Sequence, residues 1–266
     1  MMKFLRLVFM AATLFLYSCA TDSQMPIQPS AAPPFAVGKG ENPWGQKSRQ
    51  AVTPDPNQRP GLATGYGTQI RDIDRPTSFV RASSNPAETS LIYYNTRDGV
   101  NAMQGGGRAP NRRRLRNGFL EWGIESSSGR DLKTRHYRGQ RIVEGRPGQS
   151  YQIVLKNLAR SRVEVVLSVD GLDVRTGQRA SSRNQGYVIP AESTVRIKGW
   201  RSGPETVARF KFTSVGASYA NRLTGDAANV GVIGLAIYGE KGVAPFKWMP
   251  SELHTRRQAS PFAPAP

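Results

Sequence analysis

The chain has 266 residues, a formal net charge of +18 and a single cysteine. One cysteine excludes a fold stapled by internal disulfides, and two histidines leave little material for a zinc site. The excess of basic residues favours anionic partners such as nucleic acid, lipid headgroups or acidic glycans. The hydrophobic fraction of 38% is modest, which predicts that long stretches of the chain lie outside the folded core.

The first 18 residues have the layout of a secretory signal peptide. Lys3 and Arg6 precede an uncharged apolar run over residues 7–16. A run of about ten residues is too short to span a bilayer as a helix, which takes about 20. A basic start followed by such a run is typical of a signal peptide that directs export and is then removed.

The end of this segment, LYSC at residues 16–19, resembles the lipobox of bacterial lipoproteins, although Tyr17 replaces the small or β-branched residue usual there. The resemblance implies that the Cys19 thiol takes a diacylglyceryl group and becomes the N-terminus after cleavage. Ala20, where an Asp would favour the inner membrane, then implies sorting to the outer membrane. The alternative is an ordinary signal peptide with a stray cysteine. We therefore expect a cell-envelope protein attached to the membrane through lipidated Cys19.

The rest of the chain divides by composition into three parts. Residues 19–90 are rich in Pro, Gly, Gln, Ser and Asn and are predicted to be a flexible tether. Residues 91–244 carry short apolar runs separated by turn residues, which is typical of one β-domain. Residues 245–266 are polar and Pro-rich again and are predicted to be a disordered tail.

The strands predicted within this domain are short and closely spaced. They are expected over residues 91–94, 119–125, 141–144, 151–158, 163–169, 172–174, 186–189, 194–200, 207–213 and 230–238. The last of these is apolar on both faces, as in a central strand. Asp170-Gly171 predicts a hairpin turn, and a helical turn over 215–223 is expected to close at Gly225. The pattern favours an all-β fold, a single antiparallel β-sandwich with jelly-roll or Greek-key connections.

Six pieces of this domain resemble a family of uncharacterised exported bacterial β-domain proteins. They are LSVDGLDV, GYVIP, IKGWRS, VARFKF, SYANRL and NVGVIGLAIYGE, which begin at residue 167 and end at residue 240. The resemblance implies one compact domain outside the cytoplasm. It implies no activity, because no catalytic residue is established for that family.

Side chains suited to nucleophilic catalysis are sparse. A triad would have to combine His136 with a Ser such as Ser168 or Ser218 and with an Asp, and no nucleophile-elbow motif supports it. The other histidine, His254, lies in the predicted tail. We expect a protein that is not an enzyme, with a hydrolase of unknown type as an alternative.

Acidic residues also offer little for a metal or for sugar hydrolysis. Asp170 and Asp173 are too few for a Ca²⁺ site, which needs six to eight oxygens, and a hairpin explains them better. Glu121 and Glu125 are expected on the solvent side of a strand, in surface ion pairs. We therefore expect no cofactor and no metal.

Residues 108–141 are the most suggestive stretch. They contain ten basic residues against three acidic ones, with Phe119, Trp122, His136 and Tyr137 interleaved. In binding to an anionic polymer, charge supplies affinity and rings supply stacking. The predicted anion-binding residues are Arg112, Arg113, Arg114, Arg116, Arg135 and Arg138. A solvated loop paired with acidic groups elsewhere would produce the same pattern.

Two functional hypotheses follow from these observations. The first is a non-catalytic binding or structural module of an envelope protein complex. The second is a module that binds an anionic polymer directly, namely a glycan, lipid A phosphate or DNA, through the basic segment.

Overall fold

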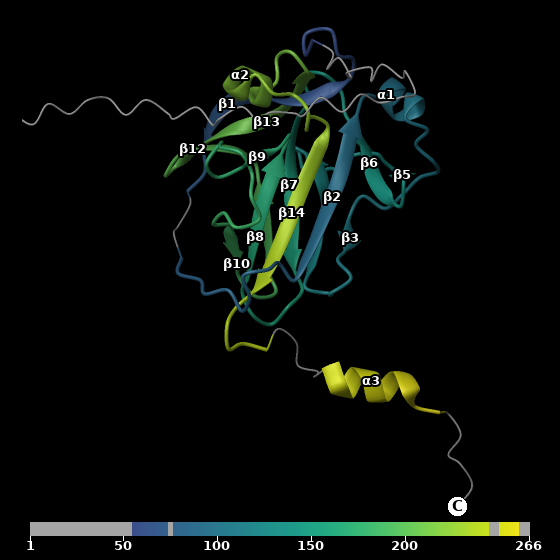
Figure 1. The fold of residues 1–266 in the computed structure, drawn as a ribbon, viewed down its shortest axis with the longest axis vertical. Helices are drawn as coiled ribbons and strands as arrows, with labels where there is room; N and C mark the ends of the chain where they lie inside the picture. The colour runs from purple at the N-terminus through teal and green to yellow at the C-terminus, as the bar shows by residue number, and fades with distance from the viewer. Residues whose placement is uncertain (1–54, 74–76, 245–249, 261–266) are drawn as a thin grey trace, which may run out of the picture. The chain divides into compact units, whose positions relative to one another are not determined.

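The structure is a computed structural model and describes residues 55–73, 77–244 and 250–260. Two β-sheets pack face to face around one hydrophobic core, which confirms the predicted β-sandwich (Figure 1). Alternate side chains of each strand enter this core, because successive residues of a strand point to opposite faces. Leu120, Trp122 and Ile124 are all fully buried, as their spacing predicts.

The first sheet has the strand order β1-β13-β7-β4-β3, with β11 pairing with β7 and β12 with β13. Its strands are β1 (Leu62–Arg71), β3 (Arg113–Arg114), β4 (Leu120–Ser126), β7 (Ser150–Asn157), β11 (Thr194–Ile197), β12 (Gly199–Gly203) and β13 (Thr206–Ser214). All of its strand pairs are antiparallel.

The second sheet has the order β10-β8-β14-β2-β6-β5, with β9 pairing with β8. Its strands are β2 (Glu88–Asn95), β5 (Thr134–Tyr137), β6 (Gln140–Glu144), β8 (Val163–Val169), β9 (Leu172–Asp173), β10 (Tyr187–Ile189) and β14 (Val232–Gly239). The strand β14 lies between β8 and β2, as its apolar sequence predicts (Figure 1). The pair β2–β6 is parallel, unlike the rest.

Connections between the sheets bring the basic segment to one edge of the sandwich. The strands β3 and β4 belong to the first sheet, whereas β5 and β6, next in the chain, belong to the second. A bridge between Arg108 and Arg135 links the strand edge of the second sheet to the loop that leads into the first. Residues 108–141 therefore occupy neighbouring edges of both sheets.

The helices are short. They are α1 (Arg97–Ala102), α2 (Tyr219–Thr224) and α3 (Pro250–Gln258). Helix α2 confirms the predicted helical turn, since Ser218 caps its start and Gly225 ends it with a φ of 66°. Helix α3 lies within residues 245–266, the segment predicted to be a disordered tail.

Two further elements differ from the predictions. The strand β1 lies inside the segment 19–90 that was predicted to be a tether, and β2 begins before residue 91. The strand predicted over 194–200 is two strands, because β11 pairs with β7 while β12 turns to β13. Gly199 opens β12 where a Cβ atom would lie 1.9 Å from the Ala208 carbonyl oxygen, so only glycine fits this close approach.

Two tight hairpin turns use residues with positive φ. Asp170 and Gly171, with φ of 53° and 79°, join β8 to β9 and confirm the predicted turn. Arg138 and Gly139, with φ of 47° and 71°, join β5 to β6 in the same way. This second hairpin forms where the sequence predicted only a polar, basic loop.

Candidate anion-binding site

The six arginines predicted to bind anions fall into two groups in the structure. Arg112 and Arg135 are engaged in ion pairs within the fold. The Arg112 Nε atom lies 3.0 Å from Asp131, and the Arg135 Nε atom lies 2.7 Å from Glu144. Their charges are neutralised locally, as the alternative of an internally paired loop would require.

The other four arginines, Arg113, Arg114, Arg116 and Arg138, are exposed. Across the described residues no ion pair involves any of them. The Arg138 guanidinium lies 5.4 Å from the centre of the Tyr137 ring, which holds it over the β5–β6 turn. The structure thus leaves a smaller basic group available than the sequence suggested.

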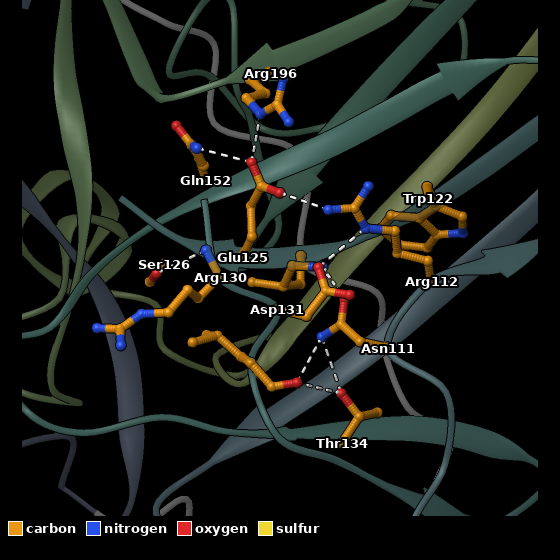
Figure 2. A network of polar contacts seen from close by, with 12 residues as sticks. Asn111, Arg112, Trp122, Glu125, Ser126, Arg130, Asp131, Thr134, Gln152 and Arg196 are labelled. Carbon is orange, nitrogen blue, oxygen red and sulfur yellow. Dashed lines mark hydrogen bonds and ion pairs between the residues drawn. The ribbon is translucent and has the colours of Figure 1, made fainter. Parts of the chain in front are cut away.

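Arg112 belongs to a polar network on the outer face of the first sheet (Figure 2). At its centre is Glu125, whose side chain is fully buried although the sequence placed it on the solvent side. The Glu125 carboxylate accepts hydrogen bonds from Arg112 Nη2 at 2.8 Å, Gln152 Nε2 at 2.8 Å and Arg196 Nε at 2.5 Å. Glu125 forms the expected ion pairs, with Arg112 and Arg196, but its predicted place on the solvent side is wrong, because these two arginines and Gln152 cover the carboxylate.

A second part of the same network holds the segment before β3 in place. The Asn111 side-chain amide donates to the Leu132 carbonyl at 2.8 Å and to the Thr134 hydroxyl at 3.0 Å, while its oxygen accepts from the Ile124 N–H at 3.0 Å. Figure 2 shows these bonds below the Asp131 carboxylate. Asn111 therefore fixes the start of the Arg-rich segment against β4, next to where Arg113 and Arg114 pair with that strand.

Three of the exposed arginines, Arg113, Arg114 and Arg116, border a hollow of about 720 Å³. It is lined by β8, β14 and the first half of β2, which lie side by side in Figure 1, and by Trp122 of the first sheet. Its walls come from β3 and the loop after it, from the β5–β6 turn and from residues 180–182. The charged residues that line it are Glu88, Arg113, Arg114, Arg116 and Arg141.

Arg141 also belongs to this group, although it is not among the six arginines predicted from the sequence. It lies on β6 with only 3% of its surface exposed. Its Nη1 atom donates to the carbonyl oxygens of Trp122, at 2.9 Å, and of Asn111. Burial, and then the charge of Arg113, lower the pKa of Arg141 to about 10, so the guanidinium stays charged at neutral pH. The alternation of residues 141–144 could have indicated that Arg141 is buried. In a strand, Arg141 and the core residue Val143 share a face.

The rest of the hollow is nearly neutral. Ser168, Gly234 and Ala236 are small residues that line it. Glu88 lies at the wall, where its two carboxylate oxygens accept the backbone N–H groups of Arg116 at 3.0 Å and Asn117 at 2.8 Å. This carboxylate orders the loop after β3 and forms no ion pair with the arginines.

Groups considered for catalysis are placed apart. His136 is exposed on β5, and its register partner on β6 is Arg141. Ser218 caps α2, and Ser168 lines the hollow. The arrangement of His136 beside a Ser and an Asp that a triad requires is therefore not formed by these residues.

The aspartates considered for a metal are structural. Asp170 is buried in the hairpin turn, and the Asp173 carboxylate accepts the Arg175 and Thr176 N–H groups at 2.9 Å each. Among the residues that the structure describes, no group of three or more His, Cys, Asp or Glu is placed to hold a metal ion.

The predicted anchor, Cys19, lies outside the described residues. In the parts of the chain that are described, no helix is long and apolar enough to cross a bilayer. Comparisons of the chain with models of protein families, with curated proteins and with solved structures found no match. The function is therefore inferred from the chemistry of the site.

Proposed function

We propose that this protein is a lipoprotein of the cell envelope, anchored through Cys19, whose β-sandwich is a non-catalytic module that binds an anionic glycan. The lipobox resemblance at residues 16–19 supports the anchor, and Ala20 supports the outer membrane. The single observation that carries the binding role is that Arg113, Arg114 and Arg116 border one hollow and are left unpaired by the fold across the described residues.

Exposed, unpaired cations at the rim of a hollow attract polyanions for a simple reason. When a protein cation binds a phosphate, sulfate or carboxylate of a polyanion, the counterions held there are released. This release favours binding, and its contribution to the binding free energy falls as the salt concentration rises. Arginine adds a planar fork that matches two oxygens of such a group. Arg112 and Arg135 do not contribute in this way, because Asp131 and Glu144 already occupy them.

A glycan is favoured over DNA because the Trp and Phe rings of the segment are not presented on the surface for stacking on successive bases, although Trp122 lines the hollow from within the core. Trp122 is fully buried in the core, and Phe119 is packed against it. Proteins that bind single strands without sequence preference present exposed rings to successive bases. The rings that remain nearer to the surface, such as Tyr137, are engaged with neighbours, since Tyr93 lies edge-on to it at 5.2 Å.

Retention on immobilised heparin tests this proposal. A triple variant, Arg113→Gln, Arg114→Gln and Arg116→Gln, is expected to elute at lower salt than the wild type. If these three contacts dominate binding, each arginine removed should reduce the slope of log K against log salt concentration by roughly a third. Arg112 stays unchanged, because its removal would disturb Glu125. A matched control removes three exposed cations elsewhere, Lys156→Gln, Arg160→Gln and Lys211→Gln.

The two variants carry the same change of net charge, so their difference reports position rather than total charge. Equal elution of the site variant and the control would contradict the proposal. Stronger retention on single-stranded DNA than on heparin at the same salt, with the same dependence on the three arginines, would replace the glycan by a nucleic acid.

A further inference from the structure

Arg141 differs from Arg81 and Arg201, two other arginines enclosed by the fold, in having no carboxylate partner within the described residues. The side chains of Arg81 and Arg201 are 19% and 12% exposed, and each faces an acid, Glu164 at 2.6 Å and Asp72 at 3.1 Å. Arg141 is the more deeply buried residue, with 3% exposure. The charge that lowers the pKa of Arg141, beside its burial, is that of another cation, Arg113.

A buried charge without a counter-charge is unfavourable for stability alone. Two backbone carbonyls and the Trp122 ring, 5.2 Å from the guanidinium carbon, offset part of the lost hydration. A hydrophobic residue of similar volume would satisfy packing without that loss. The position of Arg141 is therefore better explained by an anion that the chain itself does not supply.

The geometry leaves one edge of the Arg141 guanidinium open. The hydrogen bonds that it makes within the described residues all come from Nη1, whereas Nε and Nη2 make none there. Arg141 lines the same hollow as Arg113 and Arg114, and the small residues Ser168 and Gly234 line it too. An oxyanion can approach Nε and Nη2 with two oxygens in the plane of the fork.

We propose that Arg141 is a binding residue for one anionic group, a phosphate, sulfate or carboxylate, that enters the hollow, with Arg113 and Arg114 at its rim. This inference rests on the proposed function and deepens it, since it separates the recognition of one group from the general attraction of a polyanion. The rim arginines supply most of the salt-dependent affinity, and Arg141 distinguishes a chain that carries a protruding oxyanion from one that does not.

Inorganic phosphate is a suitable probe for the isolated group, titrated against chloride at constant ionic strength. We expect the side-chain Nε–H resonance of Arg141 in the wild-type protein to shift with saturation as phosphate is added. We also expect Arg141→Gln to weaken phosphate binding by at least about tenfold, because a charge-assisted pair of hydrogen bonds is lost. Arg141→Lys keeps the charge but loses the planar fork of the guanidinium, so its phosphate affinity is expected to lie between those of the wild type and Arg141→Gln.

The outcomes separate this inference from the proposed function. An unchanged Arg141 resonance, or phosphate binding by Arg141→Gln that equals that of the wild type, overturns the role of Arg141 whatever heparin shows. If the triple variant of Arg113, Arg114 and Arg116 is retained on heparin like the wild type, the polymer-binding function is overturned. A loss of phosphate binding in Arg141→Gln would still support the role of Arg141 in that case. If Arg141→Gln does not fold, two other measurements test the role of Arg141. They are the shift of the Arg141 Nε–H resonance in the wild type and the phosphate affinity of Arg141→Lys.

Discussion

The Tyr94 hydroxyl donates a hydrogen bond of 2.5 Å to the Asp170 carboxylate, inside the fold. The other Asp170 oxygen accepts the Thr64 N–H at 2.7 Å, and the Thr64 hydroxyl contacts the hydroxyls of Tyr94 and Tyr151. Thr64 and Tyr151 belong to the first sheet, whereas Tyr94 and Asp170 belong to the second. One buried carboxylate thus joins the two layers through polar contacts in an otherwise apolar core.

The ionisation of Asp170 predicts a specific dependence of stability on pH. Burial is the main cause that raises the pKa of Asp170 from 3.8 to about 6, against the opposing hydrogen bond from Tyr94. Between these two pH values the folded state holds more protons at this group than the unfolded state. Its contribution to the free energy of unfolding is therefore full below about pH 4 and is lost as pH rises through 6, by up to about 3 kcal/mol.

Urea denaturation of the wild type and of Asp170→Asn at several pH values checks this. Asparagine tolerates the positive φ of this position, so the variant removes ionisation while keeping the turn. We expect the difference in unfolding free energy between the two proteins to change between pH 4 and 6 and to level off above 7. A difference that stays constant over this range would contradict the raised pKa.

The burial of Glu125 makes a second prediction. Glu125→Gln removes the charge that faces Arg112 and Arg196, leaving two guanidinium groups near each other without a carboxylate between them. We expect the unfolding free energy to drop by about 2–4 kcal/mol, measured by denaturant or heat. Glu121→Gln is the matched control, since Glu121 lies on the same face of β4 and forms no ion pair among the described residues; it should cost little.

A double variant sharpens this test. Glu125→Gln combined with Arg196→Gln relieves the repulsion and should recover part of the stability lost by Glu125→Gln alone. Strictly additive losses would mean that the Glu125–Arg196 contact at 2.5 Å carries no coupling energy.

The strands that could be predicted from sequence are those with a clear period of two. The core face of β4 and the central place of β14 follow from side-chain alternation and from apolarity on both faces. The strand β1 could not be found in this way. Gly65 and Gly67 lie where a Cβ atom would crowd the neighbouring strand, and a register shift between Tyr66 and Gln69 breaks the alternation.

The site was predictable in composition but not in pairing. The abundance of arginine in residues 108–141 indicates the edge of the sandwich at which the candidate site lies. Which arginines stay unpaired depends on contacts between distant segments, as with Glu125 and Arg196, 71 residues apart. The role of Arg141 depends on its neighbours across the two sheets, which a linear pattern does not contain.

The close approach at Gly199 predicts a large loss from a small change. Gly199→Ala would place a Cβ atom 1.9 Å from the Ala208 carbonyl oxygen, and this atom belongs to the paired strand β13 and cannot move aside alone. We expect a loss of at least roughly 2 kcal/mol in unfolding free energy, with local loss of amide protection in β12. Gly107→Ala, where no atom lies within 4 Å of the added Cβ, should be close to neutral. Similar losses for the two variants would argue against the tight β12–β13 contact.

The proposed anchor makes the last prediction, which concerns where the protein resides. In a bacterium that processes lipoproteins, the full-length wild type should sediment with membranes and incorporate labelled fatty acid. Cys19→Ser removes the only thiol of the chain, so both the label and the membrane association should be lost. Ser18→Ala keeps a small residue before the cysteine and should behave as the wild type. Ala20→Asp should retain the label and move the protein toward the inner membrane. Unchanged membrane association of Cys19→Ser would show that the segment is an ordinary signal peptide or that another part of the chain holds the membrane.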